Sequence, residues 1–202
     1  MNRERKWRLF LATQQPTPET LVLDVGFSNR EYSSVDNYIE KRYPHPERLT
    51  ALGIEEPDEF ALRYPDVETV RYDGLRFPFD DKQFDICWSN AVLEHVGGRE
   101  RQVQFLSEIR RVSKRAFVTT PNRLFPVEVH TRTPILHYLP PALFDRYLRR
   151  TGKAWATSDH IQLLSETELR QRLSSAGFSD YRIVRNRFFG LTIDFVVIAA
   201  GG

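Results

Sequence analysis

The sequence has little of several features that define other classes of protein. It holds one cysteine, Cys87, which excludes an intrachain disulfide and a paired-cysteine metal or redox site. The longest late apolar run, Phe195–Ala200, has the length of a strand and falls far short of the roughly 20 residues of a membrane-spanning helix. The charged start, Met1–Phe10, lacks the apolar core of a secretory signal. We therefore expect a cytoplasmic protein with no membrane span.

Basic residues are not gathered into a stripe. The formal net charge is +2, from 29 Lys and Arg against 27 Asp and Glu, and the two signs are interleaved nearly everywhere. Nucleic-acid binding usually needs a clustered basic surface, so nucleic acid is not an expected partner. The one local excess comprises Arg3, Arg5, Lys6 and Arg8, and we expect it to be a solvated, frayed terminus.

Short apolar runs alternate with helical patterns, which predicts a Rossmann-like, doubly wound α/β sheet in a single domain over residues 1–202. Helices are expected over Glu100–Val112, around Leu143–Leu148, and from a capping box at Ser165 and Glu168 to Gly177. A short link at the end permits only a hairpin, so five parallel strands precede an antiparallel pair. The expected strands are Leu21–Val25, Leu49–Ile54, Val67–Tyr72, Phe84–Trp88, Arg115–Thr120, Tyr181–Arg187 and Thr192–Ala199.

Acidic and polar residues follow the first five expected strands, where open α/β sheets bind their ligands. These tips are Asp24–Ser28, Glu55–Glu56, Asp73–Gly74, Ser89–Asn90 and Thr120–Asn122. Their carboxylates would repel a polyphosphate and suit a ligand with hydroxyls, an amine or a cationic centre. Gly26 allows a tight turn, but Ser28 and Glu31 replace the other glycines of a dinucleotide fingerprint. A nicotinamide-dependent oxidoreductase is therefore the weaker enzyme hypothesis.

Three stretches resemble class I S-adenosylmethionine-dependent methyltransferases, and within them the methyltransferase type 11 domain group. The most specific is Arg71–Val96, which reads RYDGLRFPFDDKQFDICWSNAVLEHV. Thr119–His130 is similar to the group's fifth strand and the loop after it, and Leu164–Phe178 to its ending. The resemblance implies a seven-stranded mixed sheet whose last strand is antiparallel and inserted between its neighbours. It also implies S-adenosylmethionine as cofactor and S-adenosylhomocysteine as product.

The resemblance assigns a cofactor site to the strand tips. Asp24 and Gly26 match the first loop, which holds the methionine part and the ribose of the cofactor. Asp73 matches the residue that reads the adenine amine, and Gly74 lies beside it. Asn90 matches a position near the methionine end and the methyl group. On chemistry alone Asp24 could instead cap a strand end and Asn90 a helix.

Two positions depart from the family's pattern. Ser28 stands where the first loop often has a second glycine, and Gly53 stands where an acid usually binds the ribose. Glu55 is the expected substitute for that acid, provided that the second strand extends one pleat further, since residues two apart share a face. These departures motivate an alternative hypothesis, a non-catalytic binding protein on a methyltransferase fold.

Two histidines are candidate general bases. In-line methyl transfer mainly needs alignment and exclusion of water, and a base is needed only where the acceptor must lose a proton. His95 and His130 are the candidates, although each could be structural. A metal site from Glu128, His130 and His137 is not expected, because this stretch is a proline-rich loop without evident convergence.

A possible substrate lid follows the fifth strand, over residues 122–160. Phe125–Tyr147 combines prolines with apolar and aromatic residues, and connections of this length are often lids. An apolar lid would suit a small apolar or aromatic acceptor, while packing on the core is an equal explanation. After the fourth strand the chain lacks the Asn-Pro-Pro-aromatic run of nucleic-acid amino methyltransferases. Neither the acceptor nor the oligomeric state follows from these residues.

Overall fold

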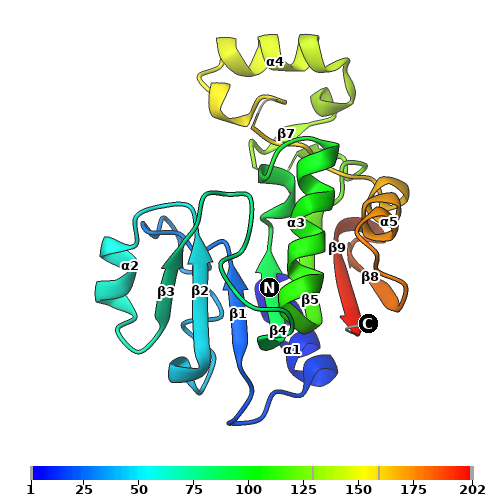
Figure 1. Cartoon of the computed structure of the whole chain (residues 1–202). Coiled ribbons are helices and arrows are strands. Elements are labelled where there is room, and N and C mark those ends of the chain that lie inside the picture. The colour runs from blue at the N-terminus through cyan, green and yellow to red at the C-terminus, as the bar shows by residue number, and fades with distance from the viewer. Residues whose placement is uncertain (1, 129, 159, 201–202) are drawn as a thin grey trace.

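The computed structural model describes residues 2–128, 130–158 and 160–200, and within them the main sheet has seven strands in the order β3-β2-β1-β4-β5-β9-β8 (Figure 1). The parallel strands are β1 Val22–Val25, β2 Leu49–Gly53, β3 Glu68–Arg71, β4 Phe84–Asn90 and β5 Ser113–Pro121. The last strand, β9 Leu191–Ala200, is antiparallel both to β5 and to β8 Tyr181–Phe188. The predicted mixed sheet, with its last strand inserted, is confirmed.

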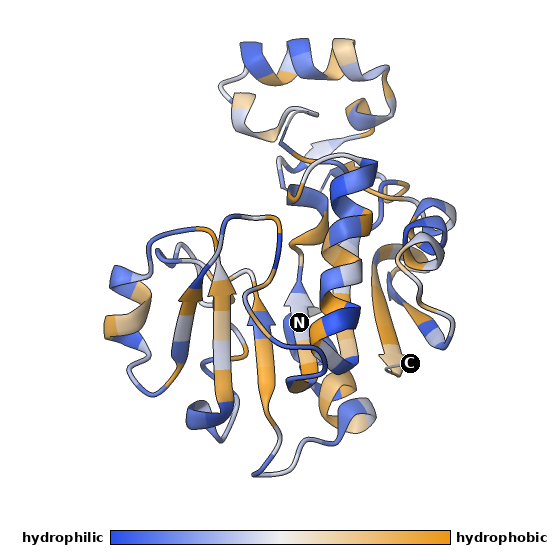
Figure 2. Cartoon of the chain, in the orientation of Figure 1, coloured by the Kyte–Doolittle hydropathy of each residue, from blue (hydrophilic) through white to orange (hydrophobic). Residues whose placement is uncertain are grey.

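Helices cover both faces of the sheet, which explains why its central strands are buried and mostly apolar. Parallel strands that are buried on both faces read as continuous hydrophobic runs, and every residue of β1 and β2 is buried. Figure 2 shows hydrophobic residues concentrated in these strands. One face packs against α3 Arg99–Val112 and α5 Glu166–Ser175, through residues such as Leu106. The opposite face holds a second core around Phe10 and Phe117.

The amino-terminal segment corrects one expectation. The residues expected to be a frayed terminus form α1 Asn2–Gln14, and its Trp7 and Phe10 are buried. Phe10 meets Trp88 and Phe117 edge-on, with ring centroids 5.0 and 5.5 Å apart. Lys6 is only 6% exposed. Burial of two large aromatic side chains against the sheet orders this helix despite its charged sequence, an effect that no local pattern reports.

The other predicted helices form with their expected ends. The Ser165 hydroxyl accepts from the backbone N–H of Glu168 while the Glu168 carboxylate accepts from Ser165, which completes the capping box. Gly177 takes the left-handed conformation at φ +84°. A short helix, α2 Asp58–Arg63, was not predicted. No helix among the described residues is long and apolar enough to cross a membrane.

The segment after β5 builds a small unit beyond the main sheet. Its elements are β6 Val127–Glu128, β7 Thr133–Pro134, the 3₁₀ turns Leu136–Tyr138 and Ala154–Ala156, and α4 Pro141–Arg150. A bridge between Asn122 and Leu164 joins the two ends of this unit. Figure 1 shows α4 above the end of the sheet where the first five strands finish. The unit therefore stands over the edge at which ligands of such sheets bind.

Candidate functional site

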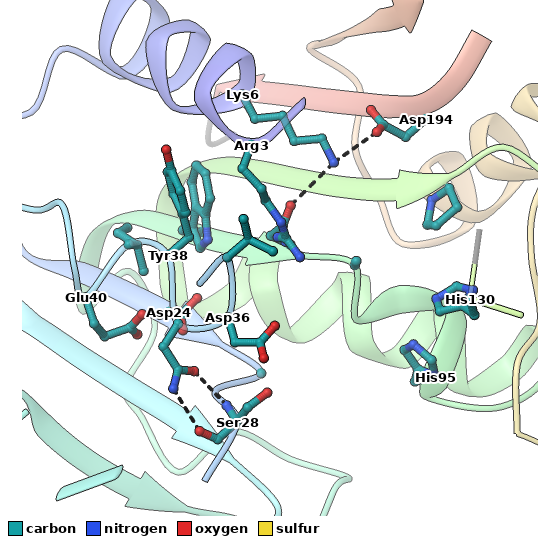
Figure 3. Close-up of a pocket in the computed structure, with 18 of the residues that line it drawn as sticks. Arg3, Lys6, Asp24, Ser28, Asp36, Tyr38, Glu40, His95, His130 and Asp194 are labelled. Carbon is teal, nitrogen blue, oxygen red and sulfur yellow. Dashed lines mark hydrogen bonds and ion pairs between the residues drawn. The ribbon is translucent and has the colours of Figure 1, made fainter. Parts of the chain in front are cut away.

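A cavity of about 380 Å³ lies at the carboxyl ends of β1, β4 and β5. Its lining includes Arg3 and Lys6 from α1, the loop after β1, residues 35–40, and Asp194 from the start of β9. Figure 3 shows the carboxyls of Asp24 and Glu40 on one side of this cavity and two imidazoles on the other. Distant segments thus combine carboxylates, cations and histidines around one space.

The sheet brings some of the predicted site residues together and leaves others apart. Lining the cavity are Asp24, Gly26, Asn90, His95 and His130. Lying outside it, exposed beyond the ends of β2 and β3, are Glu55, Asp73 and Gly74. The first group surrounds the end of the site assigned to the methionine part, and the second group corresponds to the ribose and adenine end.

The loop after β1 is packed so closely that Gly26 accepts no side chain. Gly26 has φ +103°, and an added Cβ would lie 2.3 Å from Cγ2 of Val92. Its N–H donates to the carbonyl of Leu52 at 2.8 Å. Ser28 is fixed by Asn37, whose side chain bonds both the N–H and the carbonyl of Ser28 at 2.8 Å. Reciprocal hydrogen bonds therefore define the loop at the position where a second glycine is often found.

Two acidic side chains meet at the floor of the cavity. Asp24 is 5% exposed and Glu40 is 6% exposed. Burial, followed by the neighbouring Glu40 carboxyl, raises the pKa of Asp24 well above its usual range, and burial also raises the pKa of Glu40. The two carboxyls lie within hydrogen-bonding reach of each other, and among the described residues no other side chain donates to the Glu40 oxygens. Two buried like charges disfavour full ionisation, so the pair retains a proton until a cation approaches.

A buried cation orients Asn90 at the tip of β4. Lys6 Nζ lies 3.1 Å from the Asp194 carboxylate and donates to Oδ1 of Asn90 at 3.5 Å. The Thr119 hydroxyl donates to the same oxygen at 2.8 Å. With Oδ1 occupied by two donors, the amide nitrogen of Asn90 is the group available to the cavity. Ala91, which also lines the cavity, takes a left-handed φ of +60°, an uncommon conformation for a residue other than glycine.

The two histidines meet at the far side of the cavity in an acidic setting. Their rings are 5.1 Å apart and nearly perpendicular. His130 Nδ1 lies 2.7 Å from Oε1 of Glu128, and Nε2 lies 3.7 Å from Oε1 of Glu94. Burial disfavours the charged imidazole, but these two carboxylates outweigh it and raise the pKa of His130 to about 9. Desolvation instead lowers the pKa of His95. This ring is therefore the neutral one of the two at neutral pH.

The ribose side of the predicted site differs from the expected pattern. β2 ends at Gly53, so the extra pleat required for Glu55 to replace the acid does not form. A Cβ on Gly53 would lie 2.5 Å from the Phe27 ring, which packs on Phe60 with centroids 4.6 Å apart. An aromatic side chain therefore occupies the space next to the usual acid position. Glu55 instead accepts from the backbone N–H of Asn29 at 3.1 Å.

Several lining residues have no local signal in the sequence. Arg3 and Lys6 reach the cavity through the packing of α1, Glu40 through the loop after β1, and Asp194 through the strand inserted beside β5. These residues lie far in sequence from the strand tips, or they belong to no recognisable motif. Only the three-dimensional topology identifies them.

Comparisons with known proteins show similarity to methyltransferases. Residues 38–116 match the family model described as "Methyltransferase domain". A SAM-dependent methyltransferase from Aquifex aeolicus superposes with a TM-score of 0.58 at 18% identity, covering 100% of both chains. The Burkholderia thailandensis 1,6-didemethyltoxoflavin-N1-methyltransferase, with S-adenosylhomocysteine bound, gives a TM-score of 0.62 at 17% identity, covering 99% of this chain and 78% of that one. The family model thus covers the central part of the chain, and the fold is that of the S-adenosylmethionine-dependent methyltransferases it superposes on.

A curated relative is also recognisable at the level of sequence. The glycine/sarcosine/dimethylglycine N-methyltransferase of Actinopolyspora halophila is 24% identical over 154 residues, which are 67% of this chain and 26% of the relative. The chain thus spans about a quarter of that protein's length.

S-adenosylmethionine is the cofactor of this class. The residues present fit its methionine end, because the ammonium can bind the buried carboxyl pair of Asp24 and Glu40, to which no basic side chain among the described residues is hydrogen-bonded.

Proposed function

We propose that this chain transfers a methyl group from S-adenosylmethionine to a small acceptor in the cavity of Figure 3. The observation that carries the proposal is the charge arrangement at the strand tips. A buried acidic pair, Asp24 and Glu40, faces the same space as two cationic side chains, Arg3 and Lys6. The zwitterionic methionine end of the cofactor has the complementary charges, an ammonium and a carboxylate.

In this proposal each end of the cofactor has its own residues. Asp24 and Glu40 accept from the ammonium, whose charge allows the pair to lose its retained proton. Arg3 holds the carboxylate, and the close approach of Gly26 leaves room for the ligand against the backbone. Asp73, with Gly74 beside it, accepts from the adenine amine. Its carboxylate already accepts from the backbone of Leu75, which fixes its direction.

Glu55 is proposed to contribute to the ribose side from its exposed position, since no acid ends β2. The ring of Phe27 covers Gly53 at this place, so apolar contact replaces part of the usual hydrogen bonding. We therefore expect the methionine end to contribute a larger share of the binding free energy than the ribose.

The acceptor is proposed to lie between Asn90, His95, His130 and the start of β9. The composition of the lid indicated an apolar or aromatic acceptor, but the lining on this side carries imidazoles and carboxylates. These groups support a small acceptor with a polar or ionisable group. The curated relative is named for amine acceptors of this size, which also supports the proposal.

S-adenosylmethionine supplies an activated methyl group from its sulfonium. The chain's own residues align the reaction: Asn90 presents its amide nitrogen to the cavity, and desolvation of the ring lowers the pKa of His95, although the residue keeps an exposed side. His95 can accept a proton from an acceptor at neutral pH, whereas His130, with its raised pKa, is already protonated and suits a donor role. Residues 122–160 are proposed to close over the acceptor and exclude water.

Labelled methyl transfer across a panel of small amines, carboxylates and hydroxylated aromatics tests the proposal. We expect transfer to at least one polar acceptor, with a loss in Asn90→Ala, and no change in Asp66→Asn, an exposed control. Tight cofactor binding without transfer to any acceptor would instead support the non-catalytic binding protein.

A further inference from the structure

Three potential metal ligands converge at one side of the cavity. Glu94, His95 and His130 each offer one ligand atom, and these atoms all lie within 4.8 Å of one another. Glu94 and His95 occupy the 3₁₀ turn after β4, and His130 comes from the unit after β5. Figure 3 shows the two imidazoles next to each other at the edge of the cavity. Segments 35 residues apart thus present a carboxylate and two imidazoles to a common point.

The Glu94 carboxylate has an unsatisfied oxygen aimed at this point. The side chain is fully buried, and Oε2 accepts from the Thr120 hydroxyl at 3.0 Å. Oε1 receives no hydrogen bond, and the nearest cationic atom is His130 Nε2 at 3.7 Å. An ion pair at that distance, without a hydrogen bond, leaves the buried oxygen poorly satisfied, and a metal ion in place of the His130 proton would satisfy it better.

A second set of contacts orients the imidazoles as in metal centres. Glu128 fixes Nδ1 of His130 at 2.7 Å, which turns Nε2 toward Glu94. Glu128 is itself held by the N–H and the hydroxyl of Thr131. His95 is hydrogen-bonded to the backbone of His160. Metal-binding histidines characteristically bond one ring nitrogen to a carboxylate or to a carbonyl and leave the other for the ion.

We propose that Glu94, His95 and His130 bind one divalent transition-metal ion, with its open positions facing the cavity. Two imidazoles and one carboxylate suit Zn²⁺, Mn²⁺, Fe²⁺ or Co²⁺ better than Ca²⁺, which prefers oxygen ligands alone. Glu94 Oε1 and His130 Nε2 lie 3.7 Å apart, slightly further than two ligands of one ion, and a small side-chain movement would close the difference. The set differs from Glu128, His130 and His137, because Glu128 supports His130 from behind instead of facing the ion.

The ion would determine the class of acceptor, and this part rests on the proposed function. A divalent ion lowers the pKa of a hydroxyl that it contacts, so the acceptor's proton passes to solvent. The freed lone pair then forms the bond to the methyl carbon, and the electrons of the carbon–sulfur bond remain on sulfur as a thioether. His95 and His130 would bind the ion as neutral ligands, with the release of the His130 proton, so the ion would replace the base and donor roles given to the two histidines above. The expected acceptor carries a hydroxyl beside a second ligand atom.

Metal titration of the chelator-treated, purified chain tests the site directly. We expect calorimetry with Zn²⁺ to show one site per chain, and Co²⁺ to develop visible absorption bands of a nitrogen- and oxygen-ligated ion. Glu94→Gln and His95→Ala should each weaken Zn²⁺ binding at least tenfold. His45→Ala removes a histidine that lies outside the cavity, beside Glu47 and Tyr43, and should bind as the wild type does. The exposed position of His95 makes that variant the safeguard if Glu94→Gln folds poorly.

Absence of Zn²⁺ and Co²⁺ binding by the wild type would overturn the metal site, as would equal binding by His95→Ala. The triad would then be a buried ion pair only. S-adenosylhomocysteine titration of the same samples separates the two proposals. A chain that binds the nucleoside product and transfers methyl groups without a metal keeps the proposed function and loses this inference. A chain that binds Zn²⁺ but no cofactor does the reverse.

Discussion

Replacement of Gly26 by alanine should weaken both the fold and the cofactor site. The alanine would have to hold φ near +103°, at a cost of about 1–2 kcal/mol for a left-handed L-residue. Its Cβ would also meet Val92, with Cγ2 at 2.3 Å and Cγ1 at 3.2 Å, so the valine would have to rotate or shift. Overpacking of this kind costs about 1–3 kcal/mol. The expected loss is therefore about 2–5 kcal/mol in the free energy of unfolding.

Urea denaturation of matched variants separates the two contributions. Gly152 also has a positive φ, +73°, but nothing lies within 4 Å of an added Cβ, so Gly152→Ala should lose only the backbone contribution. Val92→Ala in the Gly26→Ala background removes the blocking atoms and should recover part of the difference. Equal destabilisation by Gly26→Ala and Gly152→Ala would refute the close packing of the first loop on the turn after β4.

Two further predictions concern the acidic pair and the ribose side. Because burial raises the folded-state pKa of Asp24 and Glu40, their contribution to stability is complete below the unfolded value of about 4 and declines as pH rises toward the folded values. Glu40→Gln should therefore lose most stability relative to wild type at acid pH and least at neutral pH, and a difference independent of pH would contradict the shared proton. Phe27→Ala combined with Gly53→Asp should bind S-adenosylmethionine more tightly than Phe27→Ala alone, because the acid gains the space of the ring; calorimetry showing no gain would exclude that geometry.

The fold was accessible from the sequence because its signals are local. Continuous apolar runs mark strands buried on both faces, and Ser165 with Glu168 marks a helix start that the structure confirms. The first helix was not predicted, because its stability depends on contacts that are distant in the sequence. Its stability comes from Trp7 and Phe10 packing on strands more than 70 residues away, and its own sequence is dominated by charge. Packing of this kind overrides local preference.

The site was accessible only in part. Strand ends are predictable, so Asp24, Gly26 and Asn90 could be placed near a ligand before the fold was known. Lys6 and Glu40 reach the same cavity through tertiary packing, and no sequence motif predicts their position there. The meeting of His95 with His130 likewise depends on how the chain returns after β5, which sequence spacing does not determine.

Titration of the purified chain with S-adenosylmethionine tests the central claim most directly. We expect a dissociation constant near micromolar, which corresponds to about −8 kcal/mol. Asp24→Asn and Asp73→Ala should each weaken binding about tenfold or more, while the exposed control Asp66→Asn should not. Absence of binding by the wild type at millimolar cofactor would contradict the account, and unchanged affinity in both variants would show that the cofactor lies elsewhere.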